Sequence, residues 1–150
     1  MLADPWVEFI GEIDDEQKTD FLGNALALLF PIDWPEPFGL VMIEAMACGT
    51  PVIAWDCGAV REVVDPGLTG EIVRTEEQAL SVIDRVAALD RWKIRQTFDR
   101  RFSAVVMAEK YVSLYRQLAE ANNAFSDVIR IGDKKRYAGA NAVYAKSAER

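Results

Sequence analysis

The sequence predicts an α/β domain, with a parallel sheet and helices on both of its faces. Two short apolar runs, residues 25–30 and 51–55, are separated by a stretch of helical character. Runs joined by a crossover helix form parallel strands, because a tight turn cannot bring the chain back in the same direction. At 150 residues, about half of them apolar, the chain has the size of one domain and can bury a core.

The chain opens with a segment of strand character. Residues 7–10 are mostly β-branched or aromatic and a glycine follows them, so we expect a short strand there. A helix should follow from Asp14, because Asp14 and Gln17 have the spacing of a capping box, and it should end near Gly23. The residues expected on its buried side are Phe21 and Leu22.

The helix between the two apolar runs is the most informative element. Pro37 suits a first helical position, since the amide hydrogen that proline lacks would have no partner there, so we expect the helix to start near Pro37. Residues 40–47 are apolar almost all the way round, which predicts burial on most sides, and Gly49 can adopt the left-handed conformation that ends a helix. Glu44 is the exception, and because an unpaired buried charge is costly, it needs a partner.

The start of this helix is a candidate anion-binding site. In open parallel sheets, ligands bind beyond the carboxyl ends of the strands, against helix N-termini. We expect the free amides of Phe38, Gly39 and Leu40 to lie there, and Gly39 lacks a side chain where a ligand could approach the backbone. Glu36 lies at the mouth of this site and Glu44 deeper inside it.

After the second apolar run, the sequence predicts alternating short elements. A loop over 56–58 precedes them, and Thr75 with Gln78 has the spacing of a helix cap. The elements are a helix over 60–64, a strand over 70–73, and helices over 75–89, 92–101 and 103–120. The apolar residues on one face of the 75–89 helix are Leu80, Ile83, Val86 and Ala87. The stripe that contains Tyr111 and Tyr115 favours a docking face over stacking on a base.

The last stretch of the chain differs in composition from the rest. Residues 121–150 are rich in alanine, serine and charge, so we expect a tail, weakly helical or disordered, after a domain that covers residues 1–120. Lys134-Lys135-Arg136 form a basic cluster in this tail. Three basic residues are fewer than binding to an anionic membrane requires, so a solvated segment is favoured over a role at a membrane surface.

Charge and composition exclude several classes of function. The net charge of −7 argues against nucleic acid as a partner, since phosphate backbones are held by clustered lysine and arginine. There is no histidine, and Cys48 and Cys57 match no zinc pattern, so we expect no metal site and two thiols rather than a disulfide. No apolar run is long enough to span a membrane and residues 1–3 make no signal peptide, so we expect a cytoplasmic location, with a peripheral position at the membrane as the alternative.

One ordered string of residues resembles a known family. Glu36 and Glu44 are separated by seven residues, a spacing that resembles the E-x7-E motif of retaining glycosyltransferases of the GT-B fold, family 4 (group 1) in particular. The resemblance covers roughly residues 7–118. Its other parts are Pro37-Phe38-Gly39-Leu40, Ala47-x-Gly49-Thr50-Pro51-Val52-Ile53-Ala54, Gly58, Glu62-Val63-Val64, Gly67-x-x-Gly70, Phe102-Ser103, Tyr111 and Tyr115. The family's usual Gly-Gly-x-Pro-Glu loop lacks its second glycine and its proline here, where the sequence is Cys57-Gly58-Ala59-Val60-Arg61-Glu62, so a contact of this loop with the donor sugar is less secure.

This resemblance implies a fold and an activity. The fold would be the C-terminal, Rossmann-like domain of a GT-B enzyme, truncated at its N-terminal side. The activity would be transfer of a sugar from a nucleotide-diphosphate sugar with retention of anomeric configuration, with no cofactor and no obligatory metal. Glu36 would be the catalytic residue and contact the donor sugar, the amides of Phe38, Gly39 and Leu40 would hold the diphosphate, and Glu44 would accept hydrogen bonds from the ribose hydroxyls.

The resemblance also implies what this sequence lacks. The first two strands of the family's domain, with an arginine and a lysine that hold the donor phosphates, have no match here, nor has the N-terminal domain that binds the acceptor, so the acceptor is unknown. In the strand order three, two, one, four, five, six, the missing strands would lie between segment 7–10 and the strand at 25–30. We expect the open sheet edge either to be closed by direct pairing of these two segments or to be covered by self-association.

Alternatives remain for the two glutamates and for the chain. Glu36 could instead only stabilise the dipole of the helix, as a carboxylate at its N-terminus. A glycoside hydrolase with Glu36 and Glu44 as its carboxylate pair is disfavoured, because the two residues would face different parts of the ligand. We expect no catalysis from the chain as given. The alternative function is a non-catalytic nucleotide-sugar-binding or interaction module derived from such an enzyme.

Overall fold

The structure is a computed structural model that describes the backbone of residues 4–132 and the side chains of residues 4–121. The chain divides into two compact units, Met1–Val106 and Met107–Arg150, and the first unit contains the sheet. The residues of the candidate site all belong to the first unit.

The sheet of the first unit has three parallel strands in the order β1-β2-β3. Their bounds are Leu28–Phe30 for β1, Val52–Trp55 for β2 and Gly70–Val73 for β3. Ile53 of β2 lies opposite Leu29 of β1 and Glu71 of β3. The predicted α/β class and its parallel sheet are confirmed.

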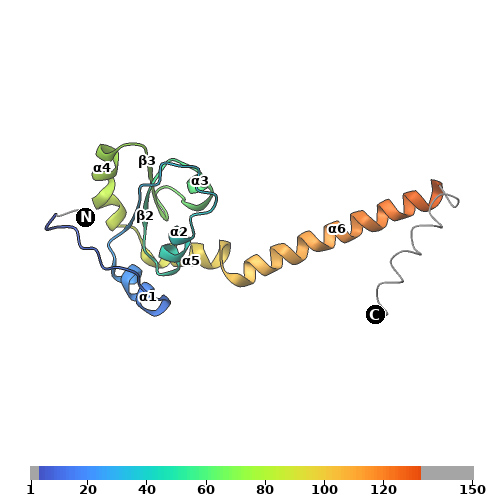
Figure 1. Cartoon of the computed structure of the whole chain (residues 1–150), viewed down its shortest axis with the longest axis horizontal. Helices are drawn as coiled ribbons and strands as arrows, with labels where there is room; N and C mark the ends of the chain where they lie inside the picture. Colours follow the sequence, from blue (N-terminus) through green and yellow to red (C-terminus); the bar gives the residue numbers. More distant parts are fainter. Residues whose placement is uncertain (1–3, 133–150) are drawn as a thin grey trace. The chain divides into compact units, whose positions relative to one another are not determined.

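Helices cover both faces of this sheet (Figure 1). The helices of the first unit are α1 (Asp15–Asn24), α2 (Leu40–Ala47), α3 (Val60–Val63), α4 (Glu76–Ala87) and α5 (Arg91–Arg101). The alternation of side chains along β2 builds two separate cores. Val52 and Ala54 pack with α2, α3 and α5, whereas Ile53 packs with α4 on the opposite face.

Helix ends with side-chain caps agree with the sequence prediction. Asp14 accepts a hydrogen bond from the Gln17 amide at 2.8 Å, and the Gln17 side chain accepts one from the Asp14 amide, which completes the predicted capping box. Thr75 caps α4 through the amide of Gln78. On α1 only part of the expected burial is correct: Leu22 is buried, whereas Phe21 is about half exposed.

The predicted strand over residues 7–10 is wrong. This segment has no strand structure, and Phe9 in it is 84% exposed. A strand forms only when its backbone groups have a partner, and the two strands that would lie between this segment and β1 are not among the described residues. Direct pairing of segment 7–10 with β1 is therefore also wrong, and cover of the edge by self-association stays a prediction.

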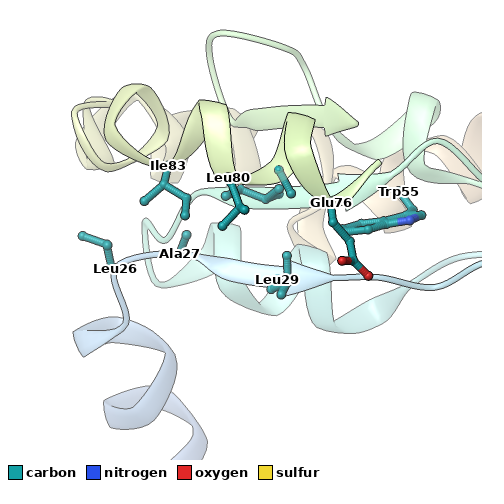
Figure 2. Close-up of a pocket in the computed structure, with 9 residues that line it drawn as sticks. Leu26, Ala27, Leu29, Trp55, Glu76, Leu80 and Ile83 are labelled. Atoms are coloured by element: carbon teal, nitrogen blue, oxygen red, sulfur yellow. The ribbon is translucent and has the colours of Figure 1, made fainter. Parts of the chain in front are cut away.

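An apolar groove lies beside the open edge, between β1, β2 and α4 (Figure 2). Its volume is about 410 Å³, and eight of its nine lining residues are apolar. Leu80 and Ile83 of α4 line the groove and are exposed, whereas Val86 is fully buried, so the predicted apolar face of α4 is only partly covered. The sheet therefore ends at an edge and a groove that both lack cover in the described part of the chain.

A single long helix, α6 (Ala104–Gly132), follows α5. It starts where the sequence predicts but continues beyond Glu120, into the predicted tail. The rings of Tyr111 and Tyr115 lie 6.1 Å apart and both side chains are exposed, and their role as a docking face stays a prediction. Of the helices that the structure describes, none combines the length and apolarity needed to cross a bilayer. The basic cluster Lys134-Lys135-Arg136 lies outside the described residues.

Candidate functional site

Glu36 lies across the N-terminus of α2. It belongs to the turn between β1 and α2, and its carboxylate Oε1 accepts a hydrogen bond from the Gly39 amide at 3.3 Å. The side chain is half-buried. A carboxylate in this position stabilises the positive end of the helix dipole, as the alternative interpretation of Glu36 predicts. It also lies beyond the carboxyl end of β1, where parallel sheets bind ligands.

The helix begins later than predicted, at Leu40 rather than near Pro37. The reason is Gly39, which is the N-cap residue and has a φ of 68°. A right-handed helix cannot include a residue in the left-handed conformation, so the turn that carries Pro37 lies outside the helix. A Cβ at Gly39 would also meet the flexible end of the Met42 side chain, but the positive φ is the stronger reason for a glycine here.

The first turn of α2 provides free backbone donors. In the described part of the chain, the amides of Phe38, Leu40 and Val41 donate no hydrogen bond, whereas the amide of Gly39 is bound to Glu36. The sequence predicted free amides at Phe38, Gly39 and Leu40: this is correct for Phe38 and Leu40, wrong for Gly39, and Val41 is an addition. Their role in donor binding stays a prediction. Free amides at a helix N-terminus favour an anionic ligand, since the helix dipole adds to their attraction.

Glu44 contacts α1, through a residue that the sequence did not indicate as its partner. Its Oε1 lies 3.0 Å from Nζ of Lys18. The carboxylate is not fully buried: 39% of the Glu44 side chain is exposed. Hydrogen bonds from the Lys18 ammonium to Glu44, and then to Asp15, raise the pKa of Lys18 above its ordinary 10.5.

A cavity of about 260 Å³ adjoins this ion pair, between α1 and α2. Lys18 and Glu44 line it, together with Cys48 at the end of α2. Glu36 is not among its lining residues. Glu36 and Glu44 therefore lie near the same helix, but only Glu44 borders this cavity.

The loop between β2 and α3 packs directly against Glu36. The amide of Ala59 donates a hydrogen bond to the Glu36 carbonyl at 3.0 Å. Gly58 has a φ of 56°, and a Cβ there would lie 2.7 Å from the Glu36 backbone nitrogen, so only glycine fits. The loop that departs from the family pattern therefore contacts the candidate catalytic residue through its backbone.

Three charged residues hold the base of this loop. Asp56 accepts hydrogen bonds from Arg61 at 2.6 and 2.7 Å, and from Arg74 at 2.8 Å. These two guanidinium groups, that of Arg61 foremost, lower the pKa of Asp56 from 3.8 to about 2. Spacing alone could not identify this cluster, because the tertiary structure brings Arg74 to Asp56 from the end of another strand.

The chain offers no evident metal ligands near these residues. Over the described residues there is no group of three or more histidine, cysteine or acidic side chains that could hold an ion. Cys48 and Cys57 are both free thiols, as expected.

Comparisons with known proteins identify the family of these residues. A family model described as "Glycosyl transferases group 1" matches residues 4–101. The chain is 31% identical over 124 residues to a phosphatidyl-myo-inositol mannosyltransferase of Mycobacterium leprae, a match that covers 78% of this chain and 33% of the relative. It is 34% identical over 116 residues to an alpha-maltose-1-phosphate synthase of Mycobacterium tuberculosis, over 68% of this chain and 30% of that protein.

Solved structures agree with the fold. A sucrose-phosphate synthase from Thermosynechococcus elongatus matches with a TM-score of 0.63 and 34% identity, over 76% of this chain and 30% of that one. HepE from Anabaena, solved in complex with UDP, matches with a TM-score of 0.55 and 22% identity, over 65% of this chain and 29% of that one, which bears on the fold alone. The chain spans about a third of the length of the curated relatives given above.

Proposed function

This chain belongs to the group 1 glycosyltransferases, which have the GT-B type of fold, and from this membership we propose that it is a donor-binding part of such an enzyme. The reaction would be transfer of a sugar from a nucleotide-diphosphate sugar to an acceptor, with retention of anomeric configuration. The observation that carries the proposal is the N-terminus of α2, where free amides follow Glu36 in the turn after β1 and Glu44 comes later in the same helix. No cofactor and no obligatory metal is part of the proposal.

The diphosphate of the donor would lie at the first turn of α2. The amides of Phe38 and Leu40 are free to donate to its oxygens. The Gly39 amide would join them if the ligand displaced the Glu36 carboxylate from its 3.3 Å contact. Such a site needs no lysine, because the helix dipole supplies the favourable potential in a chain of net charge −7.

Glu44 would bind the ribose of the nucleotide. A carboxylate can accept hydrogen bonds from two neighbouring hydroxyl groups, and Glu44 is exposed enough to do so while it keeps its contact with Lys18. The cavity of about 260 Å³ beside Glu44 provides space next to the carboxylate.

Glu36 would act on the sugar. Its carboxylate is near enough to the first turn of α2 to face a sugar that is attached to a diphosphate at that turn. In this position it would contact the sugar hydroxyls and stabilise the positive charge that develops on the sugar as the leaving group departs. The UDP in the HepE structure is a ligand of that protein, and it is compatible with a nucleotide donor here.

We expect no sugar transfer by residues 1–150 alone, because nothing in them matches the family's phosphate-binding arginine and lysine or its acceptor domain. The alternative function, a nucleotide-sugar-binding module without turnover, predicts the same binding. Measurable sugar transfer by the purified chain would contradict both the expectation and this alternative.

A calorimetric titration with UDP, GDP and ADP tests the proposal. We expect one nucleotide to bind, and Glu44→Ala to weaken its binding by about 1–3 kcal/mol, the cost of a lost hydrogen-bond partner in a binding site. Glu71→Ala is the matched control, since Glu71 also forms an ion pair, with Arg85 at 3.0 Å, but lies on β3 away from the site. If none of the three nucleotides binds, the chain has no formed donor site and the proposal fails for it.

A further inference from the structure

We propose that Asp56 is a positioning residue, which holds the turn at Glu36 in place through the loop between β2 and α3. The inference rests on the proposed function, because it concerns the residue that we assign to the donor sugar. It needs three links: an anchored loop, a contact from the loop to Glu36, and a reason why this chain requires the anchor.

The anchor is one carboxylate that joins three elements. Asp56 follows the last residue of β2, Arg61 belongs to α3, and Arg74 follows the last residue of β3. Arg61 donates from both Nε and Nη2 to the two oxygens of Asp56, a bidentate geometry that fixes orientation as well as distance. The ends of both strands and the start of α3 are therefore tied to one point.

The environment of the carboxylate suits an anchor. The Asp56 side chain is only 12% exposed, whereas those of Arg61 and Arg74 are 66% and 70% exposed. The Asp56 carboxylate, which is the least exposed of the three groups, thus has two charged partners, whereas both guanidinium groups stay largely in water. An arrangement of this kind avoids the cost of an unpaired buried charge.

The second link runs through the backbone. Between the Asp56 anchor and α3 lie Gly58 and Ala59, and these residues contact the turn that precedes α2. The Ala59 amide donates to the Glu36 carbonyl at 3.0 Å, and Gly58 approaches the Glu36 backbone so closely that a side chain would not fit. A shift of the loop would therefore move the Glu36 backbone, and with it the carboxylate.

The third link is the departure from the family pattern. Aligned with Gly-Gly-x-Pro-Glu, the chain has Gly58 at the first glycine, Ala59 at the second and Arg61 at the proline. A proline would restrict the backbone of the loop by itself. In this chain the restriction comes instead from the Arg61 side chain, which reaches back to Asp56.

Asp56→Asn tests the anchor, because asparagine has nearly the same size but no charge. The matched control is Glu71→Gln, which removes the charge of a carboxylate on β3 that is 14% exposed and paired with one arginine, Arg85 of α4. The first readout is hydrogen exchange at the Ala59 amide, followed by NMR on the full chain. We expect exchange at least about tenfold faster in Asp56→Asn and unchanged in Glu71→Gln, because only the first variant frees the loop.

The second readout connects the loop to the sugar. UDP is compared with UDP-glucose, GDP with GDP-mannose and ADP with ADP-glucose, using the pair whose nucleotide the unaltered chain binds. Asp56→Asn should abolish most of the affinity difference between the nucleotide and its sugar conjugate, while binding of the nucleotide alone changes less than twofold. Asp56→Glu, which keeps the carboxylate, should restore part of the difference.

The outcomes separate this inference from the proposed function. Equal acceleration of Ala59 exchange in both variants would overturn the anchor, since it would reflect a general loss of stability. Accelerated exchange with an unchanged preference for the sugar conjugate would overturn the positioning role. If the unaltered chain binds none of the ligands, the proposed function fails, and the exchange comparison alone decides whether Asp56 holds the loop at Glu36.

Discussion

Lys18 and Glu44 join α1 to α2 through an ion pair of 3.0 Å, although they lie on helices separated by β1 in the chain. The pair sets the direction of the Glu44 carboxylate before any ligand binds. Asp15 contacts the same ammonium group at 3.1 Å, but its own side chain is almost fully exposed, so its effect is more strongly screened by water. The sequence predicted that Glu44, a carboxylate in an apolar helix, needs a partner, and Lys18 is that partner.

Removing the charge of Glu44 should lower the pKa of Lys18. The hydrogen bond from Glu44 is the largest cause of the raised pKa, ahead of that from Asp15. We expect Glu44→Gln to bring the Lys18 pKa closer to 10.5 than Asp15→Asn does, as measured by NMR of the Lys18 side chain. Because the raised pKa belongs to the folded state, the pair contributes stability below about pH 10.5 and loses it as the pH rises through the folded-state pKa. A larger effect of Asp15→Asn would contradict this order.

The stability that Asp56 contributes should depend on pH in the acid range. Arg61 and Arg74 hold the pKa of Asp56 at about 2 in the folded chain, below the ordinary 3.8. A lowered folded-state pKa gives stability that is present above about pH 4 and is lost as the pH falls through 2. In urea unfolding, the free energy of unfolding of Asp56→Asn should therefore be well below that of the unaltered chain at pH 7. The difference should be smaller at about pH 2.5. An equal difference at both pH values would mean that Asp56 acts through something other than its charge.

Gly58→Ala should destabilise the protein more than Gly67→Ala. Both glycines have a positive φ, of 56° and 75°, so each substitution carries backbone strain, of about 1–3 kcal/mol. Only at Gly58 would the added Cβ also collide with backbone, that of Glu36, whereas the space at Gly67 is open. Equal losses of unfolding free energy in urea would show that the contact with Glu36 is looser than the structure indicates.

The open edge of the sheet should make the isolated chain self-associate, which is the second of the two outcomes that the sequence predicted. In a parallel ladder alternate residues bond to opposite sides, so the Leu29 amide and carbonyl face away from β2. We expect concentration-dependent association in sedimentation, reduced by Leu29→Lys. Trp92→Lys is the control, because Trp92 is similarly exposed but does not line the groove beside the edge. A compact monomer at high concentration would contradict the prediction.

Local patterns in the sequence identified the elements whose ends depend on neighbouring residues. Examples are the capping box at Asp14, the cap at Thr75 and the glycine that ends α2. Each of these depends only on a few residues that contact the nearby backbone. The strand at 70–73 was likewise predicted with the bounds that β3 has. The start of α2 was misplaced because Gly39 adopts the left-handed conformation, which a glycine permits but does not by itself require.

The sequence by itself determined the family, the parallel sheet and the set of residues around the start of α2. These follow from the order and spacing of residue types along the chain. Only the tertiary structure decided which groups face one another: Lys18 at Glu44, Ala59 at the Glu36 carbonyl, and two arginines at Asp56. It also decided that segment 7–10 is no strand, because a strand depends on hydrogen bonds to a neighbouring strand, and the described part of this chain has none beside this segment. Spacing along a chain specifies local geometry, whereas contacts between distant residues exist only once the cores on both faces of the sheet have packed.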